Sequence, residues 1–270
     1  MSKNNRKSGL TKRRQRVQDL NGSIKISKSR IIVYLILRMA VIAVMVAQIF
    51  NHSWDNVFTC VLTLVLFMVP SIIERRLDID LPNTLEIIIL CFIFSAEILG
   101  EIQEYYVLFA QWDDMLHTIN GFLCAAIGFS LVDILNRHEK IRFNLSPVFV
   151  AMVAFCFSMT IGVLWEFFEC CMDMFMGKDM QKDTWLTAIN SVALNPDGAN
   201  IPVKVEMDSV VINGEAWEAY LDIGLYDTMH DLYVNFIGAV VFSLFGLAYI
   251  KNRGKGFAAR FIPKLKEKKN

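Results

Sequence analysis

Acidic side chains, a histidine and two asparagines gather at the polar ends of three long apolar runs of the sequence. Within each run they recur three or four residues apart, a spacing that puts them on one face of a helix. The three sets are Asp113, His117 and Asn120; Glu166 and Glu169; and Asp227, Asp231 and Asn235. Ionisable side chains in membrane helices are costly, so these residues are the first candidates for a functional site.

Several carboxylates that meet in a dry site cannot all be ionised, so they must be protonated, paired with a histidine or bound to a cation. A divalent metal ion held by His117, Glu166, Glu169 and Asp231 is one solution, and zinc, manganese, magnesium and calcium all accept such ligands. A shared proton network without a metal is the other, with Glu166 or Glu169 as general acid or base. The residue pattern leaves both solutions open.

Each residue of the set has an expected role. The candidates for catalysis are Asp113, His117, Glu166, Glu169 and Asp231, with Asp113 orienting His117. The candidates for substrate binding are Asn235, Asp227 and Asn120. For Asp113 and Asp227 the alternative is helix capping, because a carboxylate at a helix N-terminus favours the helix dipole. No serine-histidine, HExxH or P-loop signature accompanies these residues, so the sequence leaves open whether the protein is an enzyme.

The elements that must position these residues are membrane helices. The chain has 270 residues, of which 54% are hydrophobic, and a mean hydropathy of +0.41; soluble domains have roughly 45–50% apolar residues. The apolar residues form runs of about 20, the length that crosses a bilayer as a helix. The predicted spans are 31-50, 55-73, 84-103, 115-135, 146-170 and 228-250. We therefore expect an all-α integral membrane protein with a transmembrane domain of six helices over 31-250.

The basic residues predict the orientation of these helices. Of the 27 lysines and arginines, ten lie in 1-30 and eight in 251-270. With six spans, these tails and the basic loops all fall on one side, which the positive-inside rule assigns to the cytoplasm. We expect the tail 1-30 to be disordered, and both basic cytoplasmic tails to attract anionic lipids. A nucleic-acid partner is not expected, because no stacking aromatic residues are interleaved with the charges.

The segment 178-225, between the fifth and sixth spans, has the pattern of strands and turns. The dipeptide Asn213-Gly214 separates two short apolar runs, which is a hairpin signal. Residues 201-206 alternate between apolar and polar side chains, and 196-198 form a Pro-Asp-Gly turn signal. We expect a small β-hairpin insert outside the cytoplasm, which could cover the site as a lid.

At the same positions the sequence resembles the YjdF-type bacterial inner-membrane proteins, which are distantly similar to VanZ-type membrane proteins. The shared pattern is Asp-x-x-x-His followed by Gly four residues later, then Glu-x-x-Glu, then Asp-x-x-x-Asp-x-x-x-Asn-x-x-Gly. The matching residues are Asp113, His117 and Gly121; Glu166 and Glu169; and Asp227, Asp231, Asn235 and Gly238. The resemblance covers the last three spans and implies a bacterial multi-helix membrane protein. VanZ-type relatives are associated with resistance to a glycopeptide antibiotic, but the resemblance implies no particular reaction.

These observations predict a multi-pass protein of a bacterial cytoplasmic membrane with an outward-facing carboxylate and histidine site. We expect this site to bind a divalent cation and to act on a lipid-linked or cell-envelope molecule. The alternatives are a proton- or cation-coupled transporter, in which the same carboxylates form the relay, and a non-catalytic membrane scaffold. Mutation of Glu166 separates them, because a scaffold should tolerate it.

Overall fold

The computed structural model describes residues 28–76, 79–137, 145–252 and 254–265. Most of the predicted tail 1-30, and parts of 251-270, therefore lie outside the described residues. Within the described part, five helical segments are long and apolar enough to cross a membrane. They are α2 (Lys28–Phe50), α3 (Trp54–Leu66) together with α4 (Val69–Arg76), α7 (Trp112–Arg137), α8 (Pro147–Met176) and α9 (Leu225–Lys251). The expectation of an integral membrane protein built from helices is confirmed.

The remaining predicted span, 84-103, is also helical but changes its geometry along the way. It begins as α5 (Asn83–Phe94) and continues as the π-helix η1 (Ser95–Ile102). Ser95, the first residue of η1, keeps right-handed helical dihedral angles of φ −67° and ψ −40°, so the chain does not leave the helix there. The two parts together have about the 20 residues that a bilayer requires.

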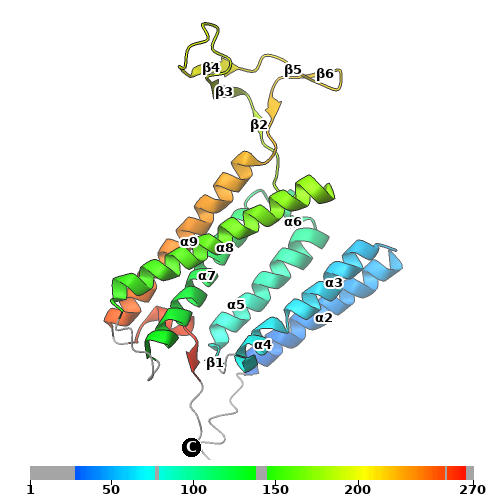
Figure 1. Cartoon of the computed structure of the whole chain (residues 1–270). Coiled ribbons are helices and arrows are strands. Elements are labelled where there is room, and N and C mark those ends of the chain that lie inside the picture. Colours follow the sequence, from blue (N-terminus) through cyan, green and yellow to red (C-terminus); the bar gives the residue numbers. More distant parts are fainter. Residues whose placement is uncertain (1–27, 77–78, 138–144, 253, 266–270) are drawn as a thin grey trace, which may run out of the picture. The chain divides into compact units, whose positions relative to one another are not determined.

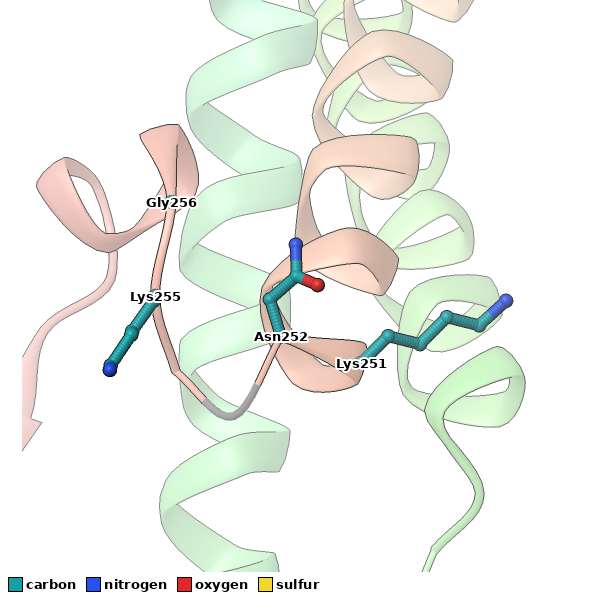
Figure 2. Close-up of a pocket in the computed structure, with 4 residues that line it drawn as sticks. All are labelled: Lys251, Asn252, Lys255 and Gly256. Atoms are coloured by element: carbon teal, nitrogen blue, oxygen red, sulfur yellow. The ribbon is translucent and has the colours of Figure 1, made fainter.

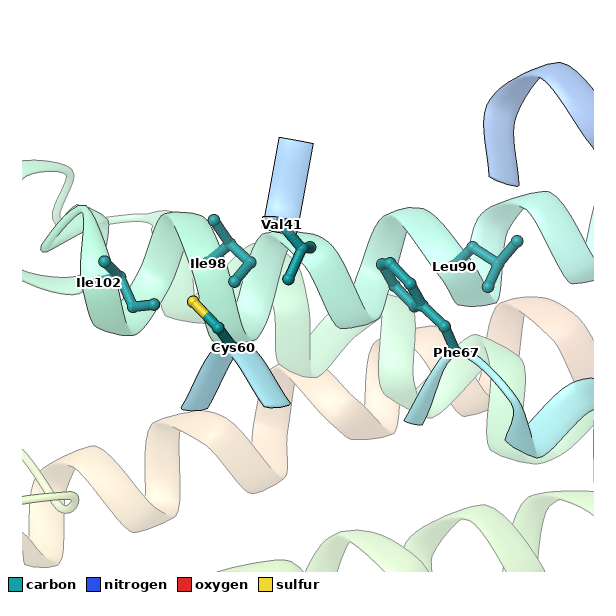
Figure 3. Packing of buried hydrophobic residues seen from close by; sticks show 6 residues of the cluster. All are labelled: Val41, Cys60, Phe67, Leu90, Ile98 and Ile102. Carbon is teal, nitrogen blue, oxygen red and sulfur yellow. The ribbon is translucent and has the colours of Figure 1, made fainter. Parts of the chain in front are cut away.

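The described residues divide into two compact units, one of the residues up to Tyr105 together with those from Pro263 on, and the other of Tyr106–Ile262. In the first unit, α2 contacts α3 and α5, and α3 contacts η1. Figure 3 shows the apolar side chains that fill this core. They are Val41, Cys60, Phe67, Leu90, Ile98 and Ile102, each at most 8% exposed. The same unit contains a short antiparallel pair of β1 (Ile79–Asp80) with β8 (Lys264–Leu265).

A buried ion pair joins the ends of three helices in the first unit. The Arg30 Nη1 atom lies 2.7 Å from Glu86 Oε2, and its Nη2 atom lies 3.5 Å from Glu74 Oε2. Glu74 also accepts a hydrogen bond of 3.0 Å from the backbone N–H of Leu81. Glu86 is 3% exposed, so Arg30 supplies the countercharge that a buried carboxylate needs.

In the second unit, α7, α8 and α9 each contact the other two, which makes a three-helix packing unit. The four-residue helix α6 (Tyr105–Leu108) precedes it, and the 3₁₀ helix η2 (Phe257–Arg260) contacts α9. Aromatic rings pack against one another in this unit. Phe122 lies edge-on to both Phe242 and Phe261, with 5.0 Å between ring centroids in each pair.

Short strands occupy the segment between α8 and α9, as predicted, and Figure 1 draws them beyond the ends of these helices. They form three antiparallel pairs: β2 (Trp185–Leu186) with β7 (Tyr220–Leu221), β3 (Ala188–Ser191) with β4 (Val203–Glu206), and β5 (Val210–Ile212) with β6 (Glu215–Trp217). The predicted Asn213-Gly214 turn joins β5 to β6, with φ of 55° and 90° at these residues. Positive φ at both positions is typical of the two-residue hairpin turn. The insert thus has more strand pairing than the single hairpin expected.

The helices that carry the candidate site residues extend farther than their apolar runs. Helix α7 begins at Trp112 instead of 115, α8 ends at Met176 instead of 170, and α9 begins at Leu225 instead of 228. An apolar run ends at the first polar residue, whereas the backbone hydrogen bonds of the helix continue past it. As a result Asp113, Asp173 and Asp227 are helical residues and share helix faces with their neighbours.

Candidate metal centre

Four candidate residues from three helices come together in the second unit. His117 comes from α7, Glu166 and Glu169 from α8, and Asp231 from α9. All four are buried, and one ligand atom from each lies within 4.8 Å of the others. The spacing along each helix predicted the shared faces, and the packing of the second unit supplies the contact between them.

Glycines allow the three helices to approach closely enough. A Cβ atom on Gly238 would lie 2.0 Å from the Thr118 carbonyl oxygen, and one on Gly121 would lie 2.1 Å from the Asn235 carbonyl oxygen. A Cβ atom on Gly162 would lie 2.6 Å from the Asn235 Nδ2 atom. Any larger residue would force these helices apart, which is the role that small residues have in membrane helix packing.

The His117 imidazole has carboxylates at both of its nitrogen atoms. Its Nδ1 atom lies 3.6 Å from Glu166 Oε1, while Nε2 lies 3.5 Å from Asp113 Oδ1 and 3.8 Å from Asp231 Oδ2. One nitrogen can therefore bind a cation while the other donates its N–H to a carboxylate. This division is common in metal sites, where the second hydrogen bond orients the imidazole.

The buried carboxylate oxygens lack the partners that burial normally demands. Both oxygens of Glu166 and the Oδ2 atom of Asp231 have no hydrogen bond of ordinary length within the described residues. Two ionised carboxylates whose oxygens lie within 4.8 Å of each other repel each other by at least about 3.5 kcal/mol at an effective dielectric constant of about 20. A bound cation or shared protons would remove both the repulsion and the missing interactions.

Glu169 is held in place by its neighbour on α8. The indole Nε1–H of Trp165 donates a hydrogen bond of 2.8 Å to Glu169 Oε1. This bond orients the carboxylate and leaves its other oxygen for a further ligand. It also places a fluorescent side chain directly on one of the candidate ligands.

Asn120 and Asn235 lie in a layer that joins the helices. The Asn120 amide donates to Asn235 Oδ1 at 3.4 Å, and Asn235 is fully buried. In the same layer the Ser158 hydroxyl donates to the Gly121 carbonyl oxygen at 2.7 Å. These contacts lie between α7, α8 and α9, so the structure gives both asparagines a packing role. Substrate binding by Asn235 and Asn120 stays a prediction.

Asp227 lies in the first turn of α9, where its charge suits the helix dipole, but a different carboxylate accepts the first backbone N–H groups of this helix. The Asp222 carboxylate accepts from the backbone N–H of Leu225 at 2.8 Å and of Tyr226 at 3.4 Å, at the start of α9. Asp227 Oδ2 instead accepts from the backbone N–H of Lys182 at 2.7 Å. Asp113 lies in the first turn of α7, where its negative charge interacts favourably with the helix dipole. The same carboxylate also contacts His117.

A segment that follows α8 is tied to the helices by residues outside the predicted site. Asp173 accepts from the backbone N–H groups of Met180 and Gln181 at 2.6 and 2.8 Å. The Gln181 side chain donates to the Thr228 hydroxyl on α9. The sequence places Asp173 on the same helix stripe as Glu166 and Glu169, although we did not assign it to the site. Gln181 and Thr228 carry no sequence signal, because their contact depends on the path of the loop.

Two hollows lie outside the carboxylate cluster. Figure 2 shows a pocket of about 420 Å³ at the end of α9, lined by Lys251, Asn252, Lys255 and Gly256. Its two lysine side chains point away from each other, so they do not converge on one ligand. A second hollow of about 390 Å³ lies among β2, β3, β7 and the start of α9. Neither contains members of the buried cluster.

The fold and the cluster define a multi-pass membrane protein with buried acidic and histidine groups that could hold a metal ion. The chain belongs to the family described as predicted membrane protein (DUF2238), which matches residues 32–252. This membership is consistent with the resemblance to YjdF-type membrane proteins of unknown function. No curated protein and no solved structure matches the chain.

Proposed function

We propose that this protein binds a divalent cation through His117, Glu166, Glu169 and Asp231. The observation that supports this most is that both oxygens of the buried Glu166 and the Oδ2 atom of the buried Asp231 have no hydrogen bond of ordinary length within the described residues. Burying a carboxylate without hydrogen bonds is expensive, and a metal ion supplies the charge and the bonds together.

The separations of the donor atoms support the same proposal. A tetrahedral ion with bonds of about 2.1 Å needs donor atoms about 3.4 Å apart. The distance of 3.6 Å from His117 Nδ1 to Glu166 Oε1 is close to this value, and the full set lies within 4.8 Å. Small side-chain rotations would bring all four donors to bonding distance. An imidazole with three carboxylates suits zinc or manganese.

The bound cation would serve a lipid-linked or cell-envelope substrate. A cation in this position can polarise a carbonyl or phosphoryl oxygen, or lower the pKa of a bound water. Asp113 would orient His117 through the 3.5 Å contact with Nε2. Asp227, Asn120 and Asn235 would border the substrate from α7 and α9.

The resemblance to YjdF-type proteins supports a location in a bacterial cytoplasmic membrane, and the basic residues support an orientation with both termini in the cytoplasm. In this orientation the tails 1-30 and 251-270 contact anionic lipids, and the insert 178-225 lies outside, above the carboxylate cluster. A fluorescent protein fused after Asn270 should fluoresce, while alkaline phosphatase fused there should be inactive. The opposite pair of results would overturn this orientation.

Metal content tests the proposed site directly. Protein purified in detergent and dialysed against zinc should retain about one metal ion per chain when measured by mass spectrometry. His117→Ala and Glu166→Gln should each lose most of it, whereas Glu218→Gln, on the exposed insert, should match the wild type. A wild-type protein that retains no metal, with a melting temperature equal to that of Glu166→Gln, would refute cation binding and favour proton exchange.

A further inference from the structure

A second group of carboxylates borders the buried cluster on its more exposed side. Asp113, Asp227 and Asp231 each offer one oxygen, and these three oxygens lie within 4.8 Å of one another. Asp113 and Asp227 are partly exposed, whereas Asp231 is 1% exposed. Asp231 belongs to both groups, so the two sets of donors meet at this residue.

Asp231, the residue that both groups share, has an oxygen that is free to bind a ligand. Asp231 Oδ2 is buried and accepts no hydrogen bond within the described residues. The other two carboxylates are already oriented: Asp227 by the backbone N–H of Lys182 at 2.7 Å, and Asp113 by its 3.5 Å contact with His117. Each of these residues keeps an oxygen for a ligand, so the group is preorganised.

The balance of charge favours more than one cation. Five carboxylates surround the joint site, namely Asp113, Glu166, Glu169, Asp227 and Asp231. No lysine or arginine forms an ion pair with any of them in the part of the chain that the structure describes. One divalent ion neutralises two of the five charges, and a second neutralises two more, which leaves a site that is nearly neutral.

We infer that Asp113, Asp227 and Asp231 form a second cation site, with Asp231 bridging it to the buried one. This inference rests on the proposed function, because the bridge needs an ion in the buried cluster. The donors of the second site are all carboxylate oxygens, so it takes a hard cation such as magnesium, manganese or calcium. The donors of the buried site differ from these because they include the His117 imidazole. A pair of bridged cations is an arrangement that suits the binding of a phosphate group.

Manganese is the probe that reports both the number of ions and the bridge. In equilibrium dialysis the wild type should bind two Mn²⁺ ions per chain, and its electron paramagnetic resonance spectrum should show exchange coupling. Asp113→Asn should retain one ion with an uncoupled spectrum. Asp208→Asn, an exposed carboxylate of the insert, should behave as the wild type. If Asp113→Asn fails to fold, Asp227→Asn repeats the test on the other rim residue.

The failures of the two proposals give different results. A wild type that binds one Mn²⁺, retained in Asp113→Asn and lost in Glu166→Gln, overturns the second site and leaves the buried one. One ion that is lost in Asp113→Asn and retained in Glu166→Gln overturns the buried site and with it the bridge. A wild type that binds no Mn²⁺ overturns both.

Discussion

The contact between α7 and α9 at Gly238 gives a sharp test of how the site is assembled. In Gly238→Ala the new Cβ atom would lie 2.0 Å from the Thr118 carbonyl oxygen, where ordinary contact begins at 3.4 Å. The two backbones must therefore separate by about 1.4 Å, because neither the carbonyl nor the Cβ atom can rotate away. Overpacking of this kind costs about 1–3 kcal/mol, which lowers the melting temperature by about 2–12 °C.

The same displacement should reach the candidate metal ligands. His117 adjoins Thr118 on α7, and Asp231 lies two helical turns before Gly238 on α9. Metal sites tolerate distance errors of only about 0.2 Å, so Gly238→Ala should weaken manganese binding at least tenfold. Thermal melts and equilibrium dialysis on protein in detergent measure the two effects.

A neighbouring glycine provides the matched control. A Cβ atom on Gly246, also on α9, would meet the Phe129 ring at 2.7 Å and no backbone atom within 3.4 Å. Gly246→Ala should therefore lower the melting temperature without weakening manganese binding, because the ring can shift while the helices stay in place. A Gly238→Ala protein with wild-type stability and wild-type metal affinity would show that close packing of α7 against α9 does not build the site.

Three further changes test other parts of the structure. Arg30→Gln leaves the buried Glu86 without its 2.7 Å ion pair and should cost about 3–5 kcal/mol by thermal melting, while the double variant with Glu86→Gln should recover most of the loss. Asp227→Ala removes the acceptor for the Lys182 backbone N–H, so trypsin should cleave after Lys182 severalfold faster than in the wild type. Unchanged cleavage would show that the hydrogen bond from Lys182 to Asp227 does not hold the segment after α8 in place. When the free metal concentration is 100 times the dissociation constant, metal binding stabilises the protein by about 2.7 kcal/mol. Adding a chelator should therefore lower the melting temperature by about 5–11 °C. Glu166→Gln should respond little, and equal shifts in both proteins would refute metal binding by Glu166.

Much of the helical architecture could be predicted from the sequence. Runs of about 20 apolar residues have one low-energy solution in a bilayer, the helix, because it satisfies its own backbone hydrogen bonds. The Asn213-Gly214 turn could be predicted for an equally local reason, since these residues tolerate the positive φ that a tight hairpin requires. Helix ends were less accurate, because a hydropathy run stops at Asp113 or Asp227 whereas the helix does not.

The sequence by itself determined which residues share a helix face, because the helical period turns a spacing of three or four into neighbours. It therefore grouped Asp113 with His117, Glu166 with Glu169, and Asp227 with Asp231. Only the tertiary structure decided that these faces meet within 4.8 Å, and that Asp222 caps α9 while Asp227 holds the Lys182 backbone. The reason is that contacts between helices depend on backbone approach at a few glycines and on the path of a loop, which no local spacing encodes.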